Sequence, residues 1–239
     1  MTGSARRAIA ASDCLVGYST YIKLLGGLTA GKEVIVSGMT KEVDRADAAV
    51  KKALEGKTVS IISSGDPGVY GMAGVVLEFL KRGTQDKIDI EIVPGIMSAN
   101  ACAALLGAPL MNDFAAISLS DIMTERKAIE KRISAAAKTD FVIVFYNPKS
   151  RSRTKPFERA IDIINRYRPP QTPVGVVRKA YRDGQAVKIV RLKGLAALKD
   201  IDMTTTIIVG NSNTYVKNGY MVTPRGYKTK KVLLSRKTS

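Results

Sequence analysis

Short apolar runs of four to six residues alternate with amphipathic stretches of ten or more, and this alternation constrains the fold more than any other feature of the chain. Short apolar runs are typical of buried strands, whereas longer stretches with apolar residues at helical spacing are typical of helices that cover a sheet. The pattern therefore predicts an α/β protein built from βα units around a largely parallel sheet. Because 45% of the 239 residues are hydrophobic, the chain can bury one large core or two smaller ones.

The pattern restarts after Ala108-Pro109 and so predicts two domains. We expect an N-terminal α/β domain over residues 1–112, a C-terminal α/β domain over residues 113–228 and a loose basic tail over residues 229–239. A short link at Asp183-Gly184 predicts that the two strands around it pair antiparallel. The expected strands cover residues 14–17, 34–36, 58–63, 88–92, 115–119, 141–146, 174–177, 186–191 and 205–209. The expected helices cover residues 2–11, 43–54, 75–80 with a stop at Gly83, 98–106, 124–137 and 156–167.

The chain contains no histidine, and its two cysteines, Cys14 and Cys102, lie far apart outside any CxxC pattern. Catalysis by Ser-His-Asp or Cys-His machinery is therefore excluded, and we expect neither a bound metal nor a structural disulfide. Chemistry that needs little proton transfer, such as alkylation by a pre-activated cofactor, fits this composition. No apolar run approaches the roughly 18 residues of a membrane span, and the start MTGSARRAIAAS lacks the apolar core of a signal peptide, so we expect a cytoplasmic protein.

The formal net charge is +17, from 38 Lys and Arg against 21 Asp and Glu. Such a charge attracts polyanions, of which nucleic acid is one class and a polycarboxylate small molecule is another. A basic surface that is only solvated gives the same count, so charge alone does not choose among the three.

Glycine, proline and polar residues gather where three predicted strands end. The loop SSGDPGVYGMAG, beginning at residue 63, carries Gly65, Gly68, Gly71 and Gly74, which allow the backbone to approach a ligand closely. The segment VPGIMS at residues 93–98 also leads from a strand into a helix. The loop YNPKSRSRT at residues 146–154 adds three basic side chains suited to carboxylates or phosphates. Each loop alone is equally typical of an ordinary turn, and none is a Walker loop or a GxGxxG fingerprint.

Taken together, six segments resemble the tetrapyrrole methylase superfamily, and within it the branch that methylates C17 of the macrocycle. The segments are VGYSTYIKLL at 16–25, SGDPGVYGMAG at 64–74, VPGIMSANACAALLGAPLMNDFAAISLSD at 93–121, FYNPKSRSRT at 145–154, VGVVRKAYRDGQ at 174–185 and TTTIIVGNSNTY at 204–215. The resemblance implies a two-domain tetrapyrrole methylase fold, with a mixed sheet flanked by helices in each domain and the active site in the interdomain cleft. It also implies a homodimer.

The resemblance further implies S-adenosylmethionine as cofactor and C17-methylation, with ring contraction, of precorrin-3B or cobalt-factor III in cobalamin biosynthesis. Carried over by position, the cofactor-binding residues are Ser64, Gly65, Asp66, Val69, Tyr70, Met97, Ser98, Asn147, Arg178 and Ala180. Candidates for acid–base or orienting roles are Asp66, Tyr18 and Lys32. Candidates for binding the acidic arms of the tetrapyrrole are Lys149, Arg151, Arg153, Arg178 and Arg182.

The chain departs from the family pattern at its start. The family opens with a strand and a Gly-Pro-Gly loop, whereas this chain opens at the expected helix 2–11, so we expect an exposed sheet edge. This departure leaves open a truncated protein that binds the cofactor without turnover. A second alternative is that the chain methylates ribosomal RNA, because a relative with this fold acts on RNA and the net charge of +17 suits such a substrate. The basic residues lack the aromatic interleaving common in single-strand readers, which makes nucleic acid the less favoured partner.

Overall fold

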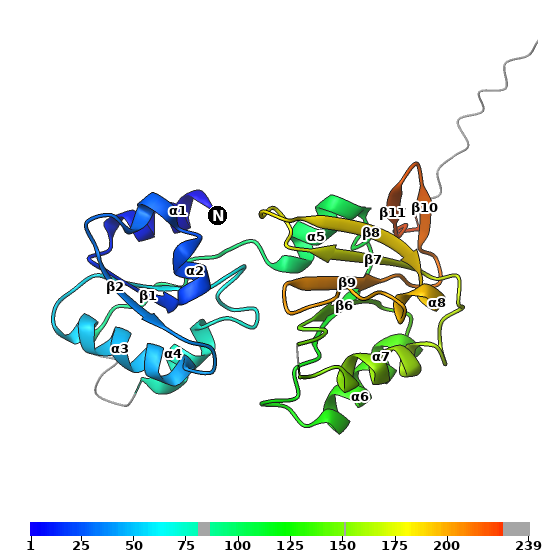
Figure 1. The fold of residues 1–239 in the computed structure, drawn as a ribbon, viewed down its shortest axis with the longest axis horizontal. Coiled ribbons are helices and arrows are strands. Elements are labelled where there is room, and N and C mark those ends of the chain that lie inside the picture. The colour runs from blue at the N-terminus through cyan, green and yellow to red at the C-terminus, as the bar shows by residue number, and fades with distance from the viewer. Residues whose placement is uncertain (81–86, 151, 227–239) are drawn as a thin grey trace, which may run out of the picture. The chain divides into compact units, whose positions relative to one another are not determined.

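The computed structural model describes residues 1–80, 87–150 and 152–226, and it divides into two compact units, Met1–Ser98 and Ala99–Ser239. Both units combine sheets with flanking helices, which confirms the predicted α/β class (Figure 1). The expected helix stop at Gly83 and the expected basic tail 229–239 lie outside the described residues. Within those residues, no helix has the length and apolar character needed to cross a membrane.

The first unit is built on a parallel sheet with the strand order β2-β1-β3. Its strands are β1 (Cys14–Tyr18), β2 (Glu33–Ser37) and β3 (Val59–Ile62). Its helices are α1 (Gly3–Ala11), α2 (Ser19–Lys23), the 3₁₀ helix η1 (Gly26–Thr29), α3 (Glu42–Leu54) and α4 (Ala73–Phe79). Helix α3 buries Ala46 and Ala49 and begins with acidic and ends with basic residues, which complements its dipole.

The register of this sheet brings the carboxyl ends of its strands to one edge. Gly17 lies beside Ile62, and Tyr18 lies beside Ser37. The loops that follow the three strands therefore begin side by side, which is where open α/β sheets bind ligands.

The strand predicted at residues 88–92 is wrong. No ladder joins this segment to the described part of the sheet, where β3 pairs only with β1. Ile90 and Ile92 are 40% and 46% exposed, so the alternation of isoleucines does not mark a buried strand face here. Alternation predicts a strand only where a neighbouring strand offers hydrogen bonds, and no described strand does so beside this segment.

The second unit is built on a five-stranded mixed sheet with the order β5-β6-β9-β7-β8. Its strands are β5 (Phe114–Ser118), β6 (Val142–Tyr146), β7 (Pro173–Arg178), β8 (Ala186–Arg191) and β9 (Thr205–Val209). Strands β5 and β6 are parallel and the other pairs antiparallel, which confirms the antiparallel pairing expected around Asp183-Gly184. Helices α6 (Arg126–Lys138), α7 (Lys155–Ile164) and α8 (Leu192–Leu195) complete a core that includes Phe145, Phe157 and Ile164.

Helix α5 (Ser98–Leu106) and strand β4 (Gly107–Ala108) pack with the second unit. Strand β4 pairs with β11 (Tyr220–Val222), which also pairs with β10 (Tyr215–Lys217). A β-carbon at Gly175 of β7 would stand 2.3 Å from Leu106 Cδ1, so the glycine lets α5 lie directly on the sheet. The chain divides into its two compact units between Ser98 and Ala99, and the domain boundary expected at residues 112–114 stays a prediction.

Candidate functional site

The Asp66 carboxylate joins two glycine-bearing turns at the carboxyl edge of the first unit's sheet. Its Oδ1 accepts a hydrogen bond of 2.8 Å from the Gly68 N–H, within the loop that follows β3. Its Oδ2 accepts one of 3.0 Å from the Gly95 N–H, in the segment 93–98. Both oxygens are therefore engaged by the main chain. Asp66 thus holds the two predicted cofactor loops together, and its catalytic role stays a prediction.

The two turns also touch directly, and glycine is required at the contact. A β-carbon at Gly95 would stand 1.9 Å from the Gly65 carbonyl oxygen and 2.9 Å from the Gly65 carbonyl carbon. Gly65 itself has a φ of +77°, and it is exposed. A β-carbon there would reach Ile96 O at 3.6 Å and Ser98 N at 3.8 Å, so its absence leaves a cradle of main-chain groups open to a ligand.

Other predicted residues of this unit line the same turns. Ser64, Val69, Met97 and Ser98 are half-buried, and the Val69 N–H donates to Asp66 O at 3.2 Å. Tyr70 is 55% exposed and has a φ of 54°, which is rare for a non-glycine residue and typical of positions constrained by function. The structure thus brings the predicted residues Ser64–Tyr70 and Met97–Ser98 into one cluster.

The two further catalytic candidates lie at opposite edges of the sheet. Tyr18 ends β1 on the same edge as the glycine turns, and its ring packs edge-on against Tyr21 with centroids 5.2 Å apart. Lys32 precedes β2 at the other edge, about 15 Å away along a five-residue strand. Its Nζ donates to Ala10 O at 2.7 Å and Ser12 O at 2.6 Å, capping the end of α1. The structure does not bring Lys32 to the cluster.

In the second unit, Asn147 begins the loop after β6 and is held in a left-handed conformation, with a φ of 52°. Its Nδ2 donates to Ser118 Oγ at 3.0 Å, so the side chain ties the end of β6 to the end of β5. The next residue is Pro148, and proline restricts the backbone of the residue before it. Asn147 is therefore strained, and the strain is maintained by neighbouring groups.

The predicted residues Arg178, Ala180 and Arg182 lie where β7 ends, and each is half-buried. Lys179 and Tyr181, which alternate with them, have φ values of 51° and 56°. The Nε of Arg178 lies 3.9 Å from Asp202 Oδ2, is buried, and has no hydrogen-bond partner among the described residues. A buried arginine N–H without an acceptor could donate a hydrogen bond to an oxygen atom of a ligand.

Asp202 keeps a negative charge beside Arg178. Burial raises the pKa of Asp202, but hydrogen bonds from Thr204 and Thr205 outweigh burial and bring the pKa below its usual value. The Oδ1 atom alone accepts from Thr204 N, Thr204 Oγ1 and Thr205 Oγ1, at 2.6–3.1 Å. The carboxylate is therefore ionised at neutral pH.

The basic residues of the 149–154 loop have different surroundings. The Lys149 ammonium lies 4.7 Å from the centre of the Phe157 ring. Arg151 lies outside the described residues. The Arg153 side chain is 12% exposed and donates to the carbonyls of Leu119 and Asn147. Arg153 is expected from the sequence to bind an acidic substrate, but both of its terminal nitrogens donate hydrogen bonds to the protein's own backbone.

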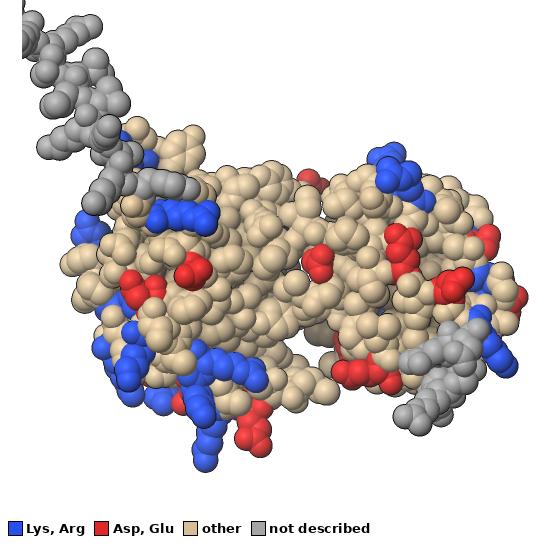
Figure 2. Space-filling view, turned by 180° about the vertical axis from the view of Figure 1, so that it is seen from behind, with Lys and Arg blue, Asp and Glu red and all other residues tan. Residues whose placement is uncertain are grey.

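Part of the exposed positive charge of the second unit lies on helix α6. Figure 2 shows Lys and Arg gathered at the lower edge of the unit that carries α6 and α7, whereas the face above is largely uncharged. Helix α6 contributes a run of exposed basic residues, namely Arg126, Lys127, Lys131, Arg132 and Lys138. Among the described residues, no group of three or more Cys, Asp or Glu side chains is arranged to hold a metal ion.

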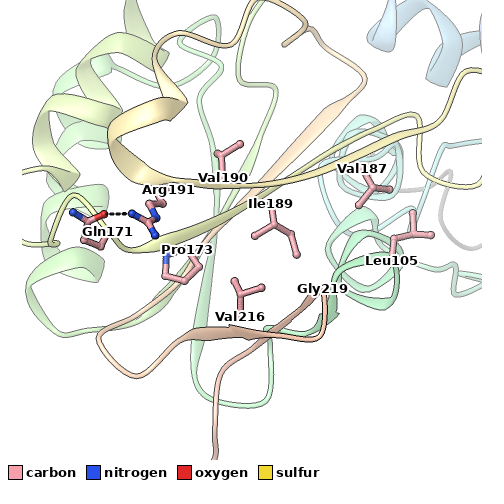
Figure 3. Close-up of a pocket in the computed structure, with 9 residues that line it drawn as sticks. All are labelled: Leu105, Gln171, Pro173, Val187, Ile189, Val190, Arg191, Val216 and Gly219. Atoms are coloured by element: carbon pink, nitrogen blue, oxygen red, sulfur yellow. Dashed lines mark hydrogen bonds between the residues drawn. The ribbon is translucent and has the colours of Figure 1, made fainter.

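A cavity of about 600 Å³ lies elsewhere, beside β8 and the β10–β11 hairpin (Figure 3). Its walls are mostly apolar, with Val187, Ile189 and Val216 pointing inward and Arg191 bound to Gln171 at 3.1 Å at one end. None of the predicted site residues lines it.

Sequence reasoning missed Ser118, Asp121 and Asp202, which support the predicted loops without belonging to them. Ser118 and Asp202 each have a signal in the sequence: Ser118 ends an apolar run, and Asp202 stands two residues before a threonine, as in an Asx turn. The contacts of these residues depend on the order of strands in the sheet. Neither of the two sequence signals predicts that order.

Comparison with known proteins identifies the family. The family described as Tetrapyrrole (Corrin/Porphyrin) Methylases matches residues 1–196. The "Cobalt-factor III methyltransferase" of Priestia megaterium is 50% identical over 98% of this chain and 44% of its own length, so the chain spans less than half of that relative. The "Probable cobalt-factor III C(17)-methyltransferase" of Salmonella typhimurium is 47% identical over 95% of this chain and 93% of its own length.

A solved structure agrees with these relatives. The crystal structure of the methyltransferase CobJ has a TM-score of 0.86 and 35% sequence identity, and the match covers 94% of this chain and 93% of that one. The resemblance carried by the strand-end motifs is thus confirmed over most of the sequence and in the fold. The chain belongs to the tetrapyrrole (corrin/porphyrin) methylase family.

Proposed function

We propose that the protein is an S-adenosylmethionine-dependent methyltransferase that methylates C17 of cobalt-factor III or precorrin-3B, with ring contraction, in cobalamin biosynthesis. The main support for S-adenosylmethionine binding is the pair of glycine turns joined through Asp66. In this pair, Gly95 packs directly against the Gly65 carbonyl group. The names of the two relatives support the substrate and place cobalt-factor III first among the two precursors.

The residues present fit this cofactor. The open main chain at Gly65, Ile96 and Ser98 offers carbonyl and N–H groups without a side chain in the way. In the second unit, Asn147, Arg178 and Ala180 stand at strand ends near backbone positions with positive φ. We propose that both sets of groups take part in binding the cofactor.

The chemistry needs mainly alignment from the protein. S-adenosylmethionine supplies a methyl group on a sulfonium, with a neutral leaving group. The chain then has to hold the acceptor carbon in line with that methyl, and positioning of this kind can lower a barrier by roughly 7–11 kcal/mol. Asp66 holds the turns, and Tyr18, at the same edge of the sheet, is the candidate for orienting the macrocycle. A chain without histidine can perform this reaction.

The proposal predicts that the protein binds S-adenosylhomocysteine, the demethylated product, in titration calorimetry. It also predicts transfer of a labelled methyl group to cobalt-factor III or precorrin-3B, detected by mass and by the visible spectrum. Product binding without transfer to either precursor would support a binding protein without turnover. A shift of ribosomal RNA in a gel, with labelling of the RNA, would instead support the RNA-methylating alternative.

We further propose that Lys149 and Arg182 bind the acidic arms of the tetrapyrrole. Because the attraction is ionic, we expect the dissociation constant of the tetrapyrrole to rise several-fold, roughly 3- to 10-fold, between 50 and 300 mM NaCl. The K149Q/R182Q double variant should have weaker binding and a flatter salt dependence. Substitution of Lys127, an exposed residue of α6, by glutamine is the control for general surface charge. A dissociation constant independent of salt, or an equal flattening by K127Q, would contradict this assignment.

The family resemblance also supports a homodimer in the cytoplasm, which we include in the proposal. Light scattering on the purified full chain gives the mass that decides the oligomeric state.

A further inference from the structure

We propose that Arg153 is a positioning residue, whose mostly buried guanidinium holds the loop after β6 in the strained conformation that presents Asn147 to the cofactor. The inference rests on the proposed function, because it takes Asn147 as part of the cofactor site. Arg153 donates hydrogen bonds to the protein's own backbone, whereas the basic sequence of the loop 146–154 by itself suggests contact with the acidic substrate.

The contacts of Arg153 join three loops of the second unit. One terminal nitrogen donates to the carbonyl of Leu119, in the loop after β5. The other donates to Asn147 O at 3.0 Å, in the loop after β6, and lies 3.4 Å from Met203 Sδ, in the loop before β9. The planar, permanently charged guanidinium can serve several acceptors at fixed angles, which an ammonium cannot.

The charge of Arg153 is balanced inside the same cluster. Its Nε lies 4.0 Å from Asp121 Oδ1, and both side chains are mostly buried, at 12% and 17% exposure. Asp121 is itself held by Arg126 at 2.9 Å. A carboxylate of this protein therefore lies close to the guanidinium and compensates part of its charge.

Asn147 is the group that needs this support. A positive φ in a residue that precedes proline is unfavourable and persists only where surrounding groups impose it. The surrounding groups here act on both parts of the residue: Ser118 accepts from its side chain, and Arg153 donates to its carbonyl. The backbone of the loop also closes on itself, since Ser150 N donates to Arg153 O at 3.0 Å. Without the guanidinium, we expect the Asn147 peptide to relax and the cofactor contact to be lost.

Titration of S-adenosylhomocysteine into wild type, R153Q and R153K tests the inference. We expect both variants to lose affinity by about 10- to 100-fold, because an ammonium cannot reproduce the contacts to three loops. In assays the KM for S-adenosylmethionine should rise with the loss of affinity, while the KM for the tetrapyrrole stays within about twofold. The matched control is R159Q, since Arg159 lies six positions along the chain on α7, is 44% exposed and pairs with Glu130.

Low millimolar methylguanidinium added to R153A should restore part of the affinity for S-adenosylhomocysteine, which mere loss of folding stability would not produce. Wild-type affinity in R153Q, or in R153K if the glutamine variant does not fold, would overturn the inference. Loss of tetrapyrrole binding with unchanged affinity for S-adenosylhomocysteine would also overturn it, in favour of a substrate clamp. Failure of the wild type itself to bind S-adenosylhomocysteine would instead refute the proposed function.

Discussion

Gly95→Ala is expected to lower the affinity for S-adenosylhomocysteine at least about 100-fold and to abolish methyl transfer. The added β-carbon would stand 1.9 Å from the Gly65 carbonyl oxygen, and the nearest atoms all belong to the main chain, so no side-chain rotation relieves the clash. Either the 93–98 segment or the turn at Gly65 must move. Movement of either one breaks the hydrogen bond from Gly95 N to Asp66 and closes the cradle beside Gly65. A displacement of about 1 Å can cost 100-fold in a positioned site.

The control for this variant is Gly27→Ala. Gly27 is exposed in η1 of the same unit, outside the proposed cofactor loops, and a β-carbon there would meet nothing within 4 Å. Replacing glycine by alanine at a compatible position stabilises a protein by about 0.4–1 kcal/mol, so G27A should bind normally and unfold at a slightly higher temperature. Calorimetry and thermal unfolding of both variants provide the comparison. Normal binding by G95A would show that the two turns do not form the cofactor site.

The alternation of apolar runs was sufficient to predict the α/β class and most strands, because local periodicity reports which residues are buried. It failed at residues 88–92, where the isoleucines alternate but no described strand lies beside them to form a ladder. Whether an alternating segment becomes a strand depends on a partner elsewhere in the chain. The close approach of Leu106 to Gly175 likewise joins residues that are far apart in sequence, so local periodicity does not report it.

For the candidate site, the sequence located the loops more reliably than it assigned the side chains. Glycine and proline at strand ends marked the turns at Gly65, Gly95 and Asn147, because such turns need those residues locally. Side-chain roles depend on what lies across the fold. Lys32 caps the end of α1, and Arg153 binds backbone carbonyls, yet in sequence both are simply basic residues near predicted loops.

Asp140→Asn is expected to lower the free energy of unfolding of the second unit by about 2–3 kcal/mol. Asp140 lies 3.0 Å from the Arg168 guanidinium, whose side chain is 4% exposed, and it also accepts from Ser212 N and Oγ. Burial lowers the pKa of Arg168, which shows that the surroundings disfavour its charge, and the Asp140 carboxylate acts in the opposite direction. Removing one partner of a fully buried ion pair costs about 3–5 kcal/mol. The loss of unfolding free energy expected for D140N is smaller because the Asp140 side chain is 37% exposed.

Asparagine is the suitable replacement because Asp140 has a φ of 64°, a conformation that asparagine tolerates well. The D140N variant therefore removes the charge without adding backbone strain. Urea unfolding followed by circular dichroism gives the size of the loss, and hydrogen exchange of the β6 amides locates it in the second unit. Asp162→Asn is the control, since its ion pair with Arg159 is 3.7 Å long and exposed on α7, and it should cost less than about 0.5 kcal/mol. If the Arg168 charge causes the loss, D140N combined with R168M should cost less than the sum of the single variants, whereas simple additivity would show that the two residues stabilise the unit independently.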